Sequence, residues 1–246
     1  MRILKVSITF LLLSIAIHSS AQKEAVAHFD KIVVSPYIQA TFIEGDEESV
    51  SIDNLKVDRS KLHIEVSNNT LHIYLEGAKH IPKNDKDYDK GSEGTRPLYA
   101  KTTVIATITY KTLNELSLRG EEEHVCKSPI AGDKFTLRVY GESKIIFNDL
   151  KLRQLYTTMY GESVLVIKSG SIKEQHYTCY GEGKIDALGI DGRLSRVTAY
   201  GEADFMLNVS DRINITAFGE AKVHYKGNPE IVKGLNFGDI SLVKMD

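Results

Sequence analysis

The sequence predicts an all-β protein built as a solenoid, in which strands stack in successive coils. A Gly followed by an acidic residue recurs in a regularly spaced series of seven copies, and successive copies are separated by 21, 20, 20, 20, 18 and 19 residues. The copies are Gly120-Glu121, Gly141-Glu142, Gly161-Glu162, Gly181-Glu182, Gly201-Glu202, Gly219-Glu220 and Gly238-Asp239. Around each Gly, apolar or small residues alternate with polar or aromatic ones, and a period of two is typical of a β-strand. A repeat of this length is too short for a pair of helices and fits one coil of a β-solenoid, which we assign to residues 116–246.

Residues 1–21 are interpreted as a secretory signal peptide. Arg2 and Lys5 form a short basic region, residues 6–17 are apolar, and Ser19-Ser20-Ala21 supplies small residues for cleavage after Ala21. The apolar run is short for a bilayer span, and no other stretch is a candidate, so the protein is not expected to span a membrane. We expect an exported protein that is periplasmic, at the outer surface or extracellular.

Residues 22–115 are expected to form an N-terminal, strand-rich part of the solenoid. Alternating segments predict strands over 31–34, 38–43, 49–52, 62–66, 71–75 and 102–110, and Asn68-Asn69 predicts a tight turn. Gly–Glu pairs are absent from these strands, which therefore form either atypical coils or a capping sheet. The polar segment 77–98 predicts a long loop. A cap is also expected at the last coil, since an open end exposes strand edges.

One phase of each repeat strand is assigned to the interior. It holds the Gly, a small residue two positions later and an apolar residue four positions later. These positions are Ser143, Ser163, Gly183, Ala203 and Ala221, followed by Ile145, Leu165, Ile185, Phe205 and Val223. The small residues predict a narrow interior in which Gly leaves room for the opposite wall.

The other phase is assigned to the surface, where it predicts two parallel columns. The aromatic column comprises Tyr140, Tyr160, Tyr180, Tyr200, Phe218 and Phe237, and the acidic column comprises Glu142, Glu162, Glu182, Glu202 and Glu220. Coils about 4.8 Å apart would stack the rings and make neighbouring carboxylates repel by roughly 1 kcal/mol in water. Lys144, Lys184 and Lys222 follow an acid by two residues and are expected to offset part of this repulsion.

The two cysteines, Cys126 and Cys179, both fall in the inward phase. They belong to coils three apart, which is more than about 14 Å and too far for a disulfide. We therefore predict two buried free thiols.

The charge balance argues against a nucleic-acid partner. Residues 1–21 hold two of the 31 basic residues and no acidic one, so their removal changes the formal net charge from −2 to −4.

Three segments of the chain are similar to a known family. The opening Phe29-Asp30-Lys31-Ile32, the closing Tyr225-Lys226-Gly227-Asn228-Pro229 and Gly238-Asp239-Ile240, after a signal peptide, resemble the GIN-domain proteins. These are described as autotransporter adhesin heads and are common in Bacteroidetes. The resemblance covers roughly residues 29–243 and implies a right-handed parallel β-helix-like solenoid with no catalytic residues to carry over. The family repeat is usually rich in Ser and Gly, whereas here it is Tyr-Gly-Glu, so no ligand is carried over.

The aromatic and acidic columns are the candidate ligand-binding surface. Aromatic faces stack on sugar rings and carboxylates accept hydrogen bonds from hydroxyls, so we expect contact with a surface glycan or an envelope protein, without a cofactor. The aromatic face could instead pack on a second subunit of a homo-oligomer. The alternative is that stacking and alternating charge only stabilise the sheet.

The alternative function is a polysaccharide lyase or hydrolase on the same scaffold. Such an enzyme needs carboxylates in two different environments, whereas a uniform column of Glu gives no separate acid and base. The His residues show no metal-ligand spacing, and no nucleophile elbow, phosphate loop or Cys-x-x-Cys motif occurs. An enzyme would also need a loop that walls a cleft, and only segment 77–98 qualifies.

Segment 77–98 also contains the candidate metal ligands. Asp85, Asp87 and Asp89 begin like a calcium-binding loop. Lys90 stands where such a loop needs Gly, and Arg96 stands where it needs Glu. A solvated charged loop is therefore the favoured interpretation.

Overall fold

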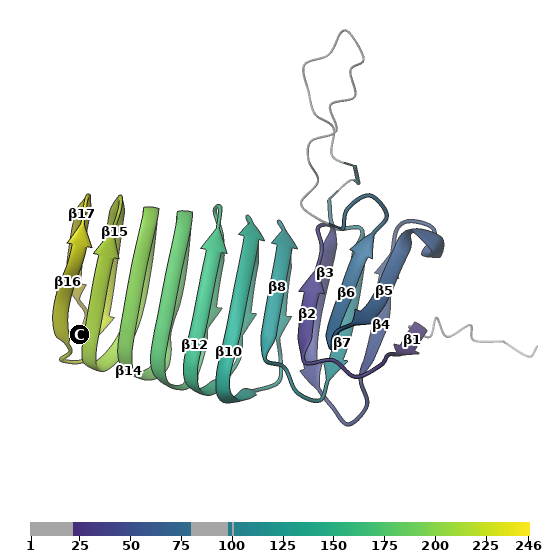
Figure 1. Ribbon diagram of the computed structural model, residues 1–246, viewed down its shortest axis with the longest axis horizontal. Coiled ribbons are helices and arrows are strands. Elements are labelled where there is room, and N and C mark those ends of the chain that lie inside the picture. Colours follow the sequence, from purple (N-terminus) through teal and green to yellow (C-terminus); the bar gives the residue numbers. More distant parts are fainter. Residues whose placement is uncertain (1–21, 80–97, 100) are drawn as a thin grey trace, which may run out of the picture.

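The computed structural model describes residues 22–79, 98–99 and 101–246 (Figure 1). The proposed signal peptide, the three candidate calcium ligands and most of segment 77–98 lie outside these ranges.

The fold is a parallel β-solenoid, as predicted, and its strands lie in two rows along the length of the molecule (Figure 1). The first row, from the N-terminal end, is β6 (Thr70–Leu75), β2 (Lys31–Val34), β8 (Glu115–Gly120), β10 (Ile130–Gly141), β12 (Leu150–Tyr160), part of β14 (Gly170–Ala217) and β16 (Glu230–Asn236). The second row is β7 (Val104–Tyr110), β3 (Ile38–Glu44), β9 (Glu123–Cys126), β11 (Lys144–Phe147), β13 (Val164–Ile167), another part of β14, β15 (Glu220–Lys226) and β17 (Asp239–Lys244).

The first coil of the chain does not lie at the end of the stack. Strand β2 pairs with β6 on one side and β8 on the other, and β3 likewise lies between β7 and β9. The chain therefore builds the coil β2–β3, then a second coil β6–β7 beside it, and returns to the opposite side to begin the repeat at β8. From β8 onward, each coil stacks on the preceding one.

Antiparallel strands cover the N-terminal end of the stack. Strand β4 (Ser49–Leu55) pairs with β7 and with β1 (Gln22–Ala25), and β5 (Leu62–Ser67) pairs with β6 through the turn at Asn68 and Asn69. A single 3₁₀ turn, η1 (Arg59–Lys61), connects β4 to β5 and is the one helical element in the described residues. The N-terminal part therefore contains both features that the sequence left open, atypical coils and a capping sheet.

The core is a continuous apolar interior formed by the inward phase of both rows. Its largest side chains include Phe42, Phe135, Phe147 and Phe205, which are almost fully buried. Cys126 and Cys179 are buried and free, as predicted. Burial raises the pKa of the Cys126 thiol, and it raises the pKa of Cys179 to about 12.

The C-terminal end differs from our expectation, because no described segment caps it. Strand β16 pairs only with β14, and β17 pairs only with β15, among residues 22–79, 98–99 and 101–246. Three large apolar side chains of this coil are exposed, Leu235 by 66%, Phe237 by 74% and Val243 by 44%.

Candidate functional site: the aromatic and acidic corner

The Tyr-Gly-Glu segment is a corner of the coil. Successive outward residues occur at three places in the coil of β12 and β13, namely Arg153–Gln154, Tyr160–Glu162 and Lys168–Ser169. The coil therefore has three sides, two of which are formed by the long strand β12 of the first row and the third by β13 of the second row. Each Gly stands where the chain passes from the first row to the second. The prediction that Gly points into a narrow interior is wrong, since Gly161 and Gly181 are exposed.

Gly is required at this corner for two reasons. Its φ is positive at every repeat corner from Gly120 to Gly219, for example +97° at Gly161. Residues that carry a Cβ rarely adopt a positive φ. A Cβ on Gly161 would also lie 2.4 Å from the carbonyl oxygen of Gly141 in the preceding coil. Gly thus allows coil to stack on coil, instead of making room for the opposite wall.

The small residue two positions after Gly faces inward, as predicted. In two coils its side chain also forms a hydrogen bond with the corner of the preceding coil. The Ser143 hydroxyl donates to the Gly120 carbonyl and the Ser163 hydroxyl to the Gly141 carbonyl, each at 2.8 Å. Gly183, Ala203 and Ala221 occupy the same position without a hydroxyl, so the small size is the common requirement.

The aromatic residues form one continuous stack along the corner. Ring centroids are 5.0, 4.7, 4.7, 4.8 and 5.7 Å apart from Tyr140 through Tyr160, Tyr180, Tyr200 and Phe218 to Phe237. The first four pairs are parallel within 5°. Arg119 occupies the preceding position, with its guanidinium carbon 5.9 Å from the Tyr140 ring centroid.

This stacking determines which part of each ring is available to a partner. The faces of the inner rings cover one another, so sugar rings could not stack on them in the way we expected. The side chains of Tyr160, Tyr180 and Tyr200 are still 37–39% exposed, through ring edges and hydroxyls. The accessible surface of the four stacked Tyr residues is therefore a row of hydrogen-bonding groups instead of a row of aromatic faces.

The acidic column runs beside the stack in register. Glu202 pairs with Glu220, and Glu220 with Asp239, on neighbouring strands, while Glu142, Glu162 and Glu182 are exposed at the equivalent corners. The lysines compensate only in part. Lys222 lies 3.1 Å from Glu220, which raises the pKa of the Lys222 ammonium, whereas Lys144 pairs with Glu123 at 2.9 Å. Lys184 makes no ion pair within the described part of the chain.

A shallow hollow of about 210 Å³ lies on the acidic column. Its lining comprises Glu182, Gly183, Lys184, Glu202, Ala203, Asp204, Glu220 and Lys222. Asp204 was not predicted as a site residue, because its alternation marks it only as outward. No cluster of three or more His, Cys, Asp or Glu suited to a metal ion occurs among the described residues.

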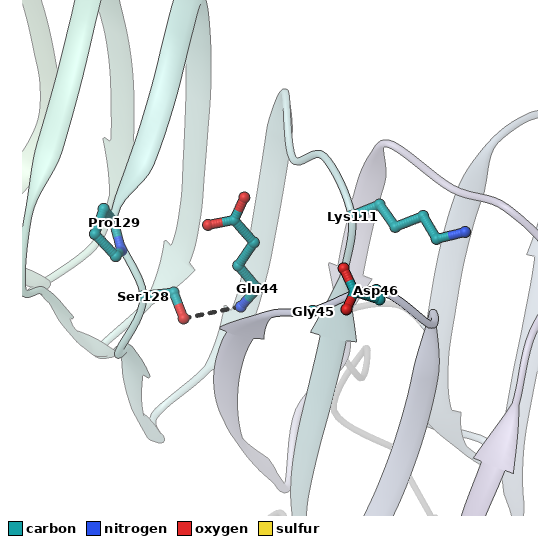
Figure 2. A pocket seen from close by; sticks show the side chains of 6 residues that line it. All are labelled: Glu44, Gly45, Asp46, Lys111, Ser128 and Pro129. Atoms are coloured by element: carbon teal, nitrogen blue, oxygen red, sulfur yellow. Dashed lines mark hydrogen bonds between the residues drawn. The ribbon is translucent and has the colours of Figure 1, made fainter.

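A second hollow, of about 470 Å³, lies where the N-terminal coils meet the repeat (Figure 2). Glu44, Gly45, Asp46, Lys111, Ser128 and Pro129 line it. The Glu44 backbone N–H donates to the Ser128 hydroxyl at 2.9 Å, and Lys111 extends away from the Glu44 carboxylate (Figure 2). These residues come from three separate turns, so no sequence pattern could have grouped them, and their polar groups do not converge on one point.

The carboxylates of the acidic column are not differentiated into an acid and a base. Glu142, Glu162, Glu182 and Glu202 are all exposed and stand in repeated surroundings. Lys79 and Leu98 are the described residues that flank the remainder of segment 77–98. The Lys79 carbonyl accepts hydrogen bonds from Ser35 and Arg119 near the start of the aromatic stack. Within the described residues, no helix is long and apolar enough to cross a membrane.

Solved structures with the same architecture come from Bacteroides and Parabacteroides species. A "putative adhesin" from Bacteroides fragilis NCTC 9343 is 18% identical with a TM-score of 0.71, over 92% of this chain and 96% of that chain. A "putative adhesin" from Parabacteroides distasonis ATCC 8503 is 20% identical with a TM-score of 0.63, over 92% and 96%. A "putative lipid binding protein" from the same strain is 20% identical with a TM-score of 0.61, also over 92% and 96%. At these identities the likeness shows the fold alone.

Comparison with curated proteins gave no match. A family model described as "Putative auto-transporter adhesin, head GIN domain" matches residues 28–229. This match covers most of the chain and ends just before β16. It agrees with the resemblance carried by the opening and closing segments, and the chain therefore belongs to the GIN-domain family of adhesin-type head domains.

Proposed function

We propose that this protein is an exported cell-envelope binding protein that adheres to a glycan along the aromatic and acidic corner. The observation that carries the proposal is the continuous strip from Tyr140 to Phe237, in which a carboxylate recurs in every coil and a Tyr hydroxyl recurs in the four coils from Tyr140 to Tyr200. Carboxylates accept hydrogen bonds and phenols both donate and accept them, which suits a ligand rich in hydroxyl groups. A repeated site also suits a polymer, because successive weak contacts add by avidity.

The family and the fold support a contact function. The description of the matching family names an adhesin, and two of the similar structures are also described as adhesins. An envelope protein is the second candidate partner, since the same strip could receive the polar side chains of another chain.

The test is a glycan array with two variants that preserve the shape of the corner. Tyr160→Phe with Tyr180→Phe and Tyr200→Phe keeps the stacked rings and removes their hydroxyls. Glu162→Gln with Glu182→Gln and Glu202→Gln keeps the side-chain size and removes the charge. We expect each triple variant to weaken glycan binding by roughly tenfold or more, because each loses several ligand hydrogen bonds.

The matched control removes three carboxylates away from the corner, with Glu47→Gln, Asp58→Asn and Asp191→Asn. This control should bind as the unmodified protein does. Equal binding by all three variants would contradict the proposal. If the unmodified protein releases sugar from a glycan and the Glu triple variant does not, the lyase or hydrolase alternative is favoured instead.

Export is the part of the proposal that rests on residues 1–21 alone. Sequencing the N-terminus of the protein recovered from the envelope or medium of its native cell should give Gln22 as the first residue. An N-terminus at Met1 would contradict export by a cleaved signal peptide.

A further inference from the structure

The aromatic stack is straight as well as continuous. From Tyr140 to Phe218, successive ring centroids are 4.7–5.0 Å apart and successive rings are parallel within 5°. The last step, from Phe218 to Phe237, is longer and more tilted, at 5.7 Å and 16°. The five coils from Tyr140 to Phe218 therefore repeat at one spacing with almost no rotation between them, and the coil of Phe237 departs from this geometry.

Two further columns of polar groups share this spacing. The acidic column follows the rings by two residues, and a column of hydroxyls precedes them by two residues. The hydroxyl column comprises Thr158, Thr178, Thr198 and Thr216, which are half-buried in the outward phase. In the coil of Tyr140 the same position is taken by Arg138, which forms an ion pair with Glu115. Each of the other four coils thus presents a Thr hydroxyl, an aromatic ring edge and a carboxylate in one line across the corner.

The spacing of the coils selects among the polymers that could lie along the stack. Side chains on one side of an extended peptide are roughly 6.6 Å apart, so a peptide strand falls out of register at the next coil. In a β-1,4-linked glycan with equatorial bonds at both positions, each pyranose ring lengthens the extended chain by nearly the spacing of the coils. An α-1,4-linked glucan, whose linkage includes an axial bond, curves into a helix and leaves a straight column.

The chemistry of the exposed groups suits the hydroxyl edges of such an extended chain. Successive rings of the chain are turned over, so neighbouring coils meet different hydroxyls. The phenols of Tyr160, Tyr180 and Tyr200 both donate and accept hydrogen bonds, and they therefore tolerate this alternation. The ring faces cover one another, so the contact is made by edges and hydroxyls.

The charge of the corner excludes one class of extended glycan. Lys144 is paired with Glu123, which lies outside the acidic column, and Lys222 is paired with Glu220. The exposed carboxylates of Glu142, Glu162, Glu182 and Glu202 outnumber the lysine that remains, Lys184. A chain of uronic acids would place like charges against this column, whereas neutral hydroxyls and amino groups donate hydrogen bonds to it.

We propose that the ligand of the corner is an extended, β-1,4-linked glycan without acidic groups, which runs along the ring stack with one sugar ring per coil from Tyr140 to Phe218. This inference rests on the proposed glycan-binding function and specifies its ligand. The straight part of the stack spans five coils, so the full contact is made by a chain of five sugars.

The test is titration calorimetry with β-1,4-linked oligomers of glucose, mannose and glucosamine, each two to eight sugars long. We expect the affinity of at least one series to rise roughly threefold with each added sugar and to level off at five, because each coil adds hydrogen bonds. The α-1,4-linked oligomers of glucose should show no such rise. The β-1,4-linked oligomers of glucuronic acid should bind at least roughly tenfold more weakly at low salt, and added salt should narrow this difference.

Two single variants test the direction of the chain. Glu142→Gln and Glu220→Gln change the two ends of the five-coil strip. Each should weaken the binding of the five-sugar oligomer roughly threefold and that of the two-sugar oligomer much less, because the shorter ligand has other coils to occupy. Asp191→Asn is the matched control, since Asp191 is exposed away from the corner, and it should change neither affinity.

The outcomes separate this inference from the function on which it rests. Glycan binding that requires the Tyr hydroxyls and Glu carboxylates but does not strengthen with chain length would overturn the inference and leave the function standing. Equal affinities for the α-1,4-linked and β-1,4-linked oligomers of glucose would do the same. The absence of any glycan binding that depends on these side chains would overturn both.

Discussion

The corners of the N-terminal coils and the corners of the repeat coils make the same turn with different residues. At the repeat corners the turning residue is Gly, and the backbone of the preceding coil lies directly against it. In the coil β2–β3 the corner contains Pro36 and Tyr37, and Tyr37 adopts a φ of +70° although it carries a side chain. Tyr37 packs against Tyr99, with ring centroids 5.5 Å apart. A positive φ alone therefore does not demand Gly, whereas the close approach of the neighbouring coil does.

The two ends of the solenoid differ in a similar way. At the N-terminal end, β4 pairs antiparallel with β7, β5 with β6 and β1 with β4. These strands cover the outermost parallel coil. At the C-terminal end, β16 and β17 keep the parallel arrangement and no described segment covers them. The regular repeat extends a stack efficiently, but a change of strand direction is what terminates it.

The largest expected effect comes from adding a methyl group at a repeat corner. Gly161→Ala should lower the free energy of unfolding by about 2–4 kcal/mol, because it combines an unfavourable φ with a contact at 2.4 Å to the Gly141 carbonyl. The measurement is urea denaturation followed by circular dichroism. Gly132→Ala is the control, since its Cβ would meet nothing within 4 Å, and it should change stability little. Equal losses in both variants would remove the distinction between the two kinds of Gly.

A smaller effect is expected at His124, where β9 of the repeat packs on β3 of the N-terminal part. His124 Nδ1 accepts from the Ala40 N–H at 3.3 Å, and burial lowers the pKa of His124 to about 3. The unfolded chain binds a proton near pH 6.5 and the folded protein does not, so stability should fall as the pH drops from about 6.5 towards 3.

The measurement is the free energy of unfolding at pH 6 and pH 4, for the unmodified protein and His124→Gln. The unmodified protein should lose about 2 kcal/mol more than the variant between these values. Glu122 acts in the opposite sense, because burial raises its pKa, but this contribution is common to both proteins. Parallel pH profiles would show that His124 is not held neutral at the junction.

The smallest expected effect concerns the buried serines of the repeat corners. Ser163→Ala should cost about 1 kcal/mol of stability, because the Gly141 carbonyl loses the hydroxyl that donates to it. Thermal unfolding compared with Ala203→Ser, which adds a hydroxyl at the equivalent corner, would measure the contribution from both directions. A stabilised Ser163→Ala variant would indicate that small size alone matters at this position.

The sequence by itself determined the solenoid, its coil length, the inward and outward phases and the two columns. Each of these follows from a period along the chain, since strand alternation repeats every two residues and the Gly–acid pairs recur about every 20. It also determined that Cys126 and Cys179 are separate buried thiols, because their positions in the repeat place them in coils too far apart for a disulfide.

Only the tertiary structure decided how the coils meet. The corner role of Gly depends on a carbonyl group in the preceding coil, and the covered ring faces depend on the stacking of residues about 20 positions apart. The place of β2–β3 between β6–β7 and β8–β9 depends on pairing between distant residues, 66 positions apart for Ile38 with Val104 and 84 positions apart for Lys31 with Glu115. A periodic pattern specifies which side of a strand is buried, but the neighbour that covers that side is chosen by contacts far apart in the chain.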